Sequence, residues 1–412
     1  MIEFTVKNNL RAVQLLSIAI LFGLANGVSA QVPAQSPLLN TVGGGVAPNF
    51  MLTMDDSGSM MFQHMPEESV VAGAFTVAHP IGSNSVRMDP GDNAILGPFF
   101  VGTIASVQGS TNWRQKLLRS PDTNTIYYNP EIRYQPWALS TFPLPAATGT
   151  APAGRRNNSP VAAAYLDPMN PGTGGTVNLT NVRNVDTRWC FRGNSTVDCQ
   201  DSSSSSNISY DPGLYYRLNK VAGAYQDPSL SASYTRYSIN SIGLAPYVPY
   251  PVKAAARLDC AGLVCTQAEE RQNFANWFTY YRTRNLMARG AMQEAFAGIS
   301  VSAPIRIGFG RINKGSASVD GVSTPVIESS ATYGGGGVRQ FSQTRKNELF
   351  SWLAALPASG GTPLPAALDA VGQYYQRADA RGPYTDDPSV GTNVVANNKT
   401  CRRSYQLMVT DL

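Results

Sequence analysis

One segment, residues 49–60 with the sequence NFMLTMDDSGSM, most constrains how this chain can fold. Its apolar run, Phe50 to Met54, stops at a loop that reads Asp-x-Ser-x-Ser. The loop presents one carboxylate and two hydroxyls directly after a strand: Asp55, Ser57 and Ser59. Open α/β sheets bind ligands at the carboxyl ends of their strands. Hard oxygen donors of this kind suit Mg²⁺ or Mn²⁺ better than zinc. The segment therefore predicts an α/β domain with a metal site at the end of its first strand.

The composition is typical of an exported protein that is rich in loops. Charged residues make up 14% of the 412, against roughly 25% in an ordinary soluble domain. The first eleven residues include the basic Lys7 and Arg11. A mostly apolar run from Ala12 to Leu24 follows, and small residues precede Gln31. This pattern predicts a Sec signal peptide over residues 1–30, because the apolar run is shorter than the about 20 residues that a membrane span needs. No other stretch is long and apolar enough to span, so a stable membrane span is not expected.

The net charge of +5 is spread along the chain. No cluster of Lys or Arg falls on a periodic stretch, which argues against nucleic-acid binding. Residues 31–60 form a lead-in and the first strand. Residues 61–265 lack helical periodicity and are rich in Gly, Pro, Ser, Asn and Tyr, which predicts a large β/coil insertion. Two short runs within it are typical of strands, Thr125 to Tyr128 and Tyr234 to Ile239.

Residues 266–412 alternate helix and strand patterns. Thr266 and Glu269 form a capping box, and a helix is expected from there to about Ala297. Its apolar face consists of aromatic residues at helical spacing: Phe274, Trp277, Phe278 and Tyr281. The later elements are expected to be a strand at 305–310, a short strand at 338–341, a helix around 349–356, a helix that has Pro363 at its first position, and a buried strand at 405–410. Such alternation predicts a mostly parallel sheet with helices on both faces.

The five cysteines are Cys190, Cys199, Cys260, Cys265 and Cys401. Close pairs in an exported chain favour disulfides, so Cys190–Cys199 and Cys260–Cys265 are the short-loop candidates among three possible pairings of these four. Cys401 is then either a buried free thiol or the partner of a cysteine outside this sequence. A zinc site is disfavoured, because neither of the two histidines is close in sequence to the cysteines.

Two further loops supply oxygen donors at matching places. Thr362 lies in a Gly-Gly hinge before a helix, and Asp411 directly follows the last strand. With Asp55, Ser57 and Ser59 they leave part of an octahedral shell open, which a partner's Asp or Glu can fill. No general base is evident nearby, so a metal-dependent hydrolase is disfavoured. The alternative is that these side chains cap a turn and a helix.

The Asp-x-Ser-x-Ser loop, the later threonine and the strand-Asp resemble the metal-ion-dependent adhesion site (MIDAS) of a von Willebrand factor type A domain. More broadly, the chain resembles PilY-type tip-associated adhesins and biogenesis factors of type IV pili. This resemblance rests on the signal peptide and on LTMDDSGSM, TIYYNPEIRYQPW, EERQNFANWFTYYRTRNLMARGAM, IRIGFGRIN, GGTPLPAAL and CRRSYQLMVTD. It implies a Rossmann-like type A sheet with a large insertion after the first strand. It also implies that Mg²⁺ or Mn²⁺ is held by Asp55, Ser57, Ser59, Thr362 and Asp411.

The resemblance implies a non-enzymatic envelope protein of the periplasm, outer membrane, pilus tip and cell surface. Its expected partners are minor pilins and the pilus tip, together with host-cell or abiotic surfaces. In the family the type A domain continues past the strand-Asp, and a β-propeller with a calcium site follows. These 412 residues contain neither, so the chain is expected to be a fragment with an incomplete sheet. The alternative is a secreted type A protein that binds or senses surfaces independently of pili.

Overall fold

The described residues of the computed structural model are 45–61, 63, 65, 116, 119–142, 154–171, 175–180, 183–185, 189–190, 199–200, 208–210, 213–228, 230–240 and 247–411. For 183–185, 189–190, 199–200 and 208–210 only the backbone is described. The expected signal peptide lies outside this set. The chain divides into two units, residues 1–46 and 47–412, and all that follows concerns the second. None of the described helices is long and apolar enough to cross a membrane.

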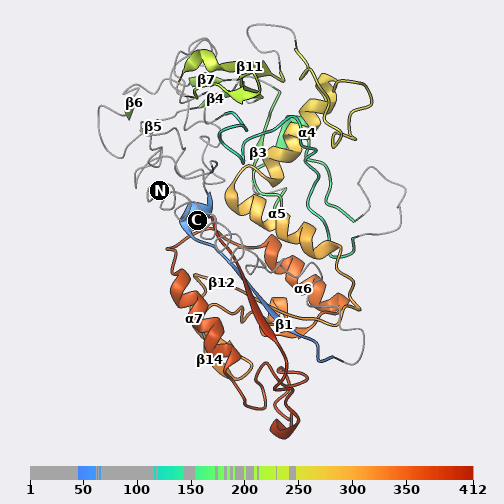
Figure 1. Cartoon of the computed structure of the whole chain (residues 1–412), viewed down its shortest axis with the longest axis vertical. Coiled ribbons are helices and arrows are strands. Elements are labelled where there is room, and N and C mark those ends of the chain that lie inside the picture. Colours follow the sequence, from blue (N-terminus) through green and yellow to red (C-terminus); the bar gives the residue numbers. More distant parts are fainter. Residues whose placement is uncertain are drawn as a thin grey trace, which may run out of the picture. The chain divides into compact units, whose positions relative to one another are not determined.

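A four-stranded sheet contains the first predicted strand (Figure 1). Its order is β15 (Arg339–Gln340), β12 (Arg306–Arg311), β1 (Asn49–Met54) and β16 (Ser404–Val409). β1 pairs in parallel with both neighbours, whereas the short β15 runs antiparallel to β12. The chain moves from β1 to one side through β12 and β15, and then returns to β16 on the other side. The carboxyl ends of β1 and β16 therefore lie at a topological switch point, where open α/β sheets bind ligands.

Helices cover both faces of the sheet, as the alternation of patterns predicted. Phe50, Leu52 and Met54 of β1 contact the core that α5 (Arg284–Ala297) and α6 (Gln343–Ala354) bury. Met51 points to the other face, where α7 (Leu364–Tyr375) packs. Figure 1 shows α6 and α7 on opposite sides of the strands. Because successive side chains of a strand face opposite ways, β1 needs apolar residues at nearly every position.

The helix predicted from Thr266 to Ala297 is in fact two helices. α4 (Gln267–Tyr280) begins at the predicted capping box, which is confirmed: the Thr266 hydroxyl accepts from the Glu269 N–H, and the Glu269 carboxylate accepts from the Thr266 N–H at 2.7 Å. α4 ends before Tyr281, and α5 begins after Thr283. Thr283 is extended, with φ −116° and ψ 159°, and its hydroxyl caps α5. The prediction of one helix was wrong because this residue starts a new one.

Two smaller corrections concern α7 and β16. Pro363 is the N-cap of α7 and not its first helical residue, because the N–H of Leu364 closes a turn on the carbonyl of Thr362 at 2.9 Å. β16 is only partly buried, and Leu407 is 48% exposed. The prediction of a buried strand was wrong because, in the described sheet, β16 has β1 as its neighbour on one side only.

The insertion shares a hydrophobic core with α4. Aromatic residues of both segments form this cluster, among them Tyr127, Tyr128, Tyr134, Tyr215, Tyr216, Tyr234, Phe274, Trp277 and Phe278. Tyr215 and Tyr216 are 2% and 1% exposed, so they are core residues. The predicted domain boundary between residues 265 and 266 thus runs between segments that pack together.

The remaining regular structure consists of short elements. The antiparallel pairs are β2 (Ala164–Tyr165) with β3 (Thr176–Val177), β4 (Arg183–Val185) with β7 (Ile208–Tyr210), β5 (Trp189–Cys190) with β6 (Cys199–Gln200), β8 (Leu214–Leu218) with β11 (Tyr234–Ser238), β9 (Lys220–Val221) with β10 (Ala224–Tyr225), and β13 (Ala317–Val319) with β14 (Val322–Thr324). The 3-10 helices are η2 (Gly58–Met61), η3 (Val161–Ala163), η4 (Ser231–Ser233), η5 (Ala331–Tyr333) and η6 (Val395–Asn397). The strand predicted at Tyr234–Ile239 is confirmed as β11. The strand predicted at Thr125–Tyr128 is wrong, because the Tyr127 N–H closes a turn on the Asn124 carbonyl at 3.0 Å.

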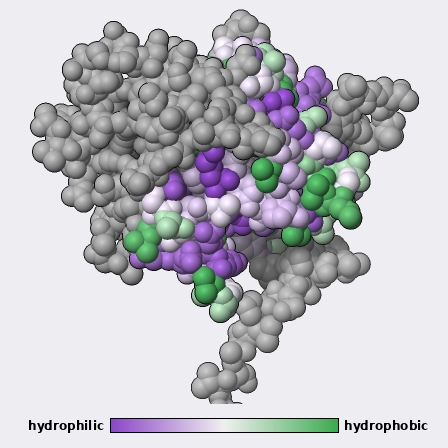
Figure 2. All heavy atoms as spheres, turned by 90° about the horizontal axis from the view of Figure 1, so that it is seen from above, coloured by the Kyte–Doolittle hydropathy of each residue, from purple (hydrophilic) through white to green (hydrophobic). Residues whose placement is uncertain are grey.

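Hydrophobic side chains also reach the surface. Figure 2 shows them as several separate groups on a described surface that is otherwise mostly hydrophilic. Large exposed fractions occur at Leu263, Leu258 and Val252, with 92%, 77% and 70%. Exposed apolar residues are common on folded proteins, so this exposure by itself identifies no partner.

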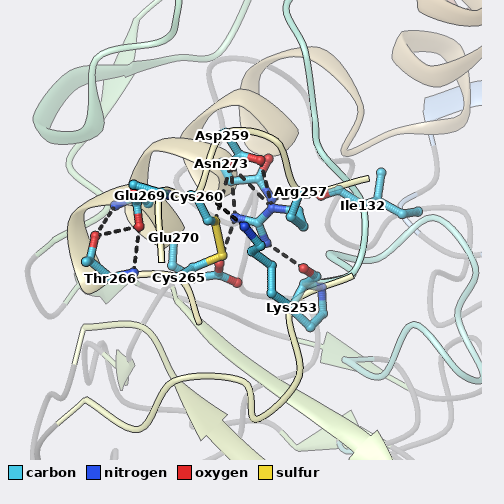
Figure 3. The surroundings of a disulfide bond; sticks show 12 residues. Ile132, Lys253, Arg257, Asp259, Cys260, Cys265, Thr266, Glu269, Glu270 and Asn273 are labelled. Atoms are coloured by element: carbon cyan, nitrogen blue, oxygen red, sulfur yellow. Dashed lines mark hydrogen bonds and ion pairs between the residues drawn. A yellow bond between two sulfur atoms is a disulfide. The ribbon is translucent and has the colours of Figure 1, made fainter. Parts of the chain in front are cut away.

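The predicted Cys260–Cys265 disulfide is confirmed. It closes a short loop directly before the capping box of α4, and Figure 3 shows the two together. Arg257, which is 1% exposed, joins the loop to α4 through an ion pair with Glu270 at 2.9 Å. The backbone register places Cys190 opposite Cys199, but the disulfide predicted there involves side chains outside the described set. Cys401 is free and exposed, so the buried-thiol alternative was wrong.

Replacing both Cys260 and Cys265 by serine should lower the free energy of unfolding by about 2 kcal/mol, because the cross-link restricts a short loop in the unfolded chain. Thermal and denaturant unfolding of the purified variant measure this loss. Cys401→Ser is the matched control and should leave stability unchanged. Equal stability of the double variant and the wild type would show that α4 needs no covalent anchor.

Candidate metal site at the carboxyl ends of the central strands

The ends of β1 and β16 bring two predicted ligands to the same edge of the sheet. Met54 lies opposite Val409 in the register, so Asp55 follows this paired row by one residue and Asp411 follows it by two. The Asp55 N–H continues the pairing by donating to the Val409 carbonyl at 2.8 Å. The Thr410 hydroxyl donates to Asp55 Oδ2 at 2.7 Å. Parallel pairing thus fixes the position of one carboxylate loop relative to the other.

The loop before α7 meets the Asp55 loop through backbone contacts. The Gly58 N–H donates to the Gly360 carbonyl at 3.0 Å, and the Ser359 N–H donates to the Asp56 carbonyl at 2.6 Å. Gly360 has a φ of +102°, a backbone conformation that strongly favours glycine. Thr362 lies two residues further along this loop and is solvent-exposed. The structure therefore brings the third predicted loop to the site, with Thr362 at its solvent side.

The Asp-x-Ser-x-Ser loop is compact and largely buried. Asp55 is 0% exposed, and its Oδ1 accepts the Ser57 N–H at 2.7 Å. Ser57 is 1% exposed, and its hydroxyl lies 2.9 Å from that of Ser59. The carboxylate thus stabilises the turn, as the capping alternative proposed, and the two hydroxyls lie close to each other. Such pre-organised oxygen atoms suit a hard divalent cation.

Asp411 is held by a buried cation. Arg284 Nη1, from the first residue of α5, lies 2.7 Å from Asp411 Oδ2, and the two side chains are 2% and 6% exposed. Sequence reasoning missed this contact, because 127 residues separate the two partners. The site therefore contains a basic group that the predicted ligand set lacked.

Asp56 is a second residue that sequence reasoning missed. It is 0% exposed, forms an ion pair with Arg311, and accepts the Asn313 N–H at 2.9 Å. The Asn313 side-chain amide also donates to the Gly361 carbonyl at 2.7 Å. Asp56 and Asn313 thus connect three loops that follow β1, β12 and α6. The sequence placed Asp56, Arg311 and Asn313 at the ends of two predicted strands, but it did not show that their side chains meet.

The predicted donor set is of a kind that suits Mg²⁺ or Mn²⁺ better than zinc. Two carboxylates and three hydroxyls were predicted, and all are oxygen donors. In the described part of the chain, no three His, Cys, Asp or Glu side chains group in a way that could hold a metal. The predicted ligand set contains only two such side chains, Asp55 and Asp411, and its other donors are hydroxyls. It is therefore not a group of this kind.

Similar proteins are found over most of the chain. It is 28% identical over 388 residues to the type IV pilus biogenesis factor PilY1 of Pseudomonas aeruginosa strain UCBPP-PA14. It is 25% and 24% identical over 378 residues to PilY1 of strains PAO1 and PAK. Each match covers 92% of this chain, which spans 24% of the relative's length. No family model and no solved structure matches. The similarity over nearly the whole chain identifies it as a PilY1-like protein.

Proposed function

We propose that this chain acts in type IV pilus biogenesis and binds surfaces or partner proteins through a divalent cation on a type A domain. The observation that carries the proposal is that Asp55, the end of the strand that precedes Asp411, and the Gly360–Thr362 loop lie at one edge of the sheet. Asp55, Ser57, Ser59, Thr362 and Asp411 would hold Mg²⁺ or Mn²⁺. A carboxylate of the partner would fill the open coordination position.

The strand order supports the type A domain. Counted in chain order, β1, β12, β15 and β16 are the first to fourth strands, and they lie in the sheet as 3-2-1-4. This is the start of the doubly wound order 3-2-1-4-5-6, whose ligands bind beside the first strand. The Asp-x-Ser-x-Ser loop follows that strand.

The surroundings of the site support binding rather than hydrolysis. Asp56 is engaged by Arg311 and Asn313, and Asp411 is engaged by Arg284. A general base must lie within reach of the proton it removes and have a free lone pair for it. Asp56 is held by its arginine and asparagine partners, and Asp411 is itself one of the proposed metal ligands, so we propose a non-enzymatic role.

The proposal is tested in the native host by shearing pili from the cells. A protein that contains this chain should appear in the sheared fraction and be absent from that of a strain without the major pilin. Asp55→Asn should leave it in the fraction but abolish Mg²⁺-dependent attachment of the cells to a surface. Asp379→Asn, a change at an exposed carboxylate paired with Arg377, is the control and should attach normally.

Two results would contradict the proposal. Equal amounts of the protein in both sheared fractions would indicate a surface protein that is independent of pili. Normal attachment of the Asp55→Asn strain would show that attachment does not require a metal at this site.

A further inference from the structure

We infer that Arg284 is an internal cation that competes with the divalent metal for Asp411 and thereby lowers the metal affinity of the site. The inference rests on the proposed metal site. Arg284 Nη1 lies 2.7 Å from Asp411 Oδ2, and neither side chain is more than 6% exposed. Arginine keeps its charge at any physiological pH, so this contact places a permanent positive charge on a candidate metal ligand.

The position of Arg284 is not explained by the needs of its helix. Arg284 is the first residue of α5, and α5 has no acidic residue in its first turn. The positive end of the helix dipole disfavours a cation there. Asp411, at the end of a strand far along the chain, is a partner that stabilises Arg284. α5 also packs against η2, the 3-10 helix that contains Ser59, so the helix that carries the cation contacts the Asp55 loop itself.

Two cations cannot share one buried carboxylate without repulsion. Charges in a largely buried site are poorly screened, so a divalent ion on Asp411 and the guanidinium would repel each other strongly. We therefore expect binding of the metal to move the guanidinium away from Asp411. The site would have two arrangements: one in which Arg284 neutralises Asp411, and one in which the metal does. The first keeps the edge of the sheet folded when metal is scarce, because a buried carboxylate needs a partner.

Isothermal titration calorimetry with Mn²⁺ tests the inference on the purified chain. Arg284→Gln, which removes the charge, should bind Mn²⁺ at least about tenfold more tightly than the wild type. Arg284→Lys keeps a charge and should stay within about threefold of the wild type. Arg155→Gln is the matched control, because it breaks another arginine–carboxylate pair, that of Arg155 with Glu294 of α5. Its affinity for Mn²⁺ should not change.

Thermal unfolding gives a second readout. Without metal, Arg284→Gln should unfold at a lower temperature than the wild type, since Asp411 loses its partner. Mn²⁺ should raise its midpoint by more than it raises that of the wild type, because tighter binding stabilises more at a given concentration. A variant that folds only with Mn²⁺ would support the inference in the same way.

The outcomes separate the two proposals. If the wild type binds Mn²⁺ through Asp55 and Arg284→Gln binds it equally well, the metal site stands and the competition is wrong. If neither protein binds Mn²⁺, the metal site itself fails. Should Arg284→Gln not fold under any condition, a crystal structure of the wild type with Mn²⁺ decides. The Arg284–Asp411 separation should then exceed the roughly 4 Å limit of an ion pair, and an unchanged contact beside a bound metal would overturn the inference.

Discussion

Asp55→Asn should weaken Mg²⁺ binding by at least about a hundredfold and leave the fold intact. Even residues that only support a metal ligand change affinity by about 10- to 100-fold, so loss of a charged ligand should cost no less. The asparagine oxygen can still accept the Ser57 N–H, and its amide can donate to the Thr410 hydroxyl, the two groups that Asp55 contacts. The variant therefore removes the charge while it keeps the turn. Calorimetric titration with Mg²⁺ measures the affinity, and circular dichroism checks the fold.

Asp379→Asn is the matched control for this experiment. Its carboxylate is 50% exposed and pairs with Arg377, so Mg²⁺ affinity should not change. Should Asp55→Asn and the wild type bind Mg²⁺ equally well, Asp55 would have only the structural role of closing the turn. The capping alternative would then be the better description of the loop.

Trp277→Ala should lower the free energy of unfolding by about 3–5 kcal/mol, the usual cost of truncating a large buried aromatic residue. Trp277 is 1% exposed and packs edge-on against Tyr127 and Tyr128. Its indole N–H donates to the Ile126 carbonyl at 2.9 Å, and that carbonyl would lose its buried partner. The lost packing contacts belong to the core that the insertion shares with α4.

Denaturant unfolding followed by tryptophan fluorescence and circular dichroism measures this loss. Leu368→Ala on α7 is the control: Leu368 is 49% exposed, so the change should cost less than about 0.5 kcal/mol. A loss below about 1 kcal/mol for Trp277→Ala would contradict a shared core. The insertion would then fold independently of α4.

Features that depend on neighbouring residues were predictable from the sequence. The capping box at Thr266 needs four residues, and the Cys260–Cys265 disulfide closes a sequence separation of 5. The strand at Phe50–Met54 and its Asp-x-Ser-x-Ser loop are likewise local patterns. Such local patterns are retained in the folded structure, because the interactions that form them join residues only a few positions apart.

Features that depend on distant partners were not predictable. Arg284 and Asp411 meet across 127 residues, and Arg311 reaches Asp56 across 255. The break between α4 and α5 has a local cause in Thr283, but the prediction extended the helix beyond Tyr281, where its aromatic face ends. The segment Thr125–Tyr128 was predicted to be a strand because tyrosine has a high β propensity. Its tyrosines are buried against α4, where tertiary packing overrides β propensity.

The most direct test of the metal site is anomalous diffraction from a crystal of this chain that contains Mn²⁺. The proposed site predicts one anomalous peak at the ends of β1 and β16, within about 2.3 Å of oxygen atoms of Asp55, Ser57 and Ser59. A well-ordered Asp-x-Ser-x-Ser loop with no peak beside it, at Mn²⁺ concentrations well above those in the cell, would contradict the claim that this edge of the sheet binds a divalent cation.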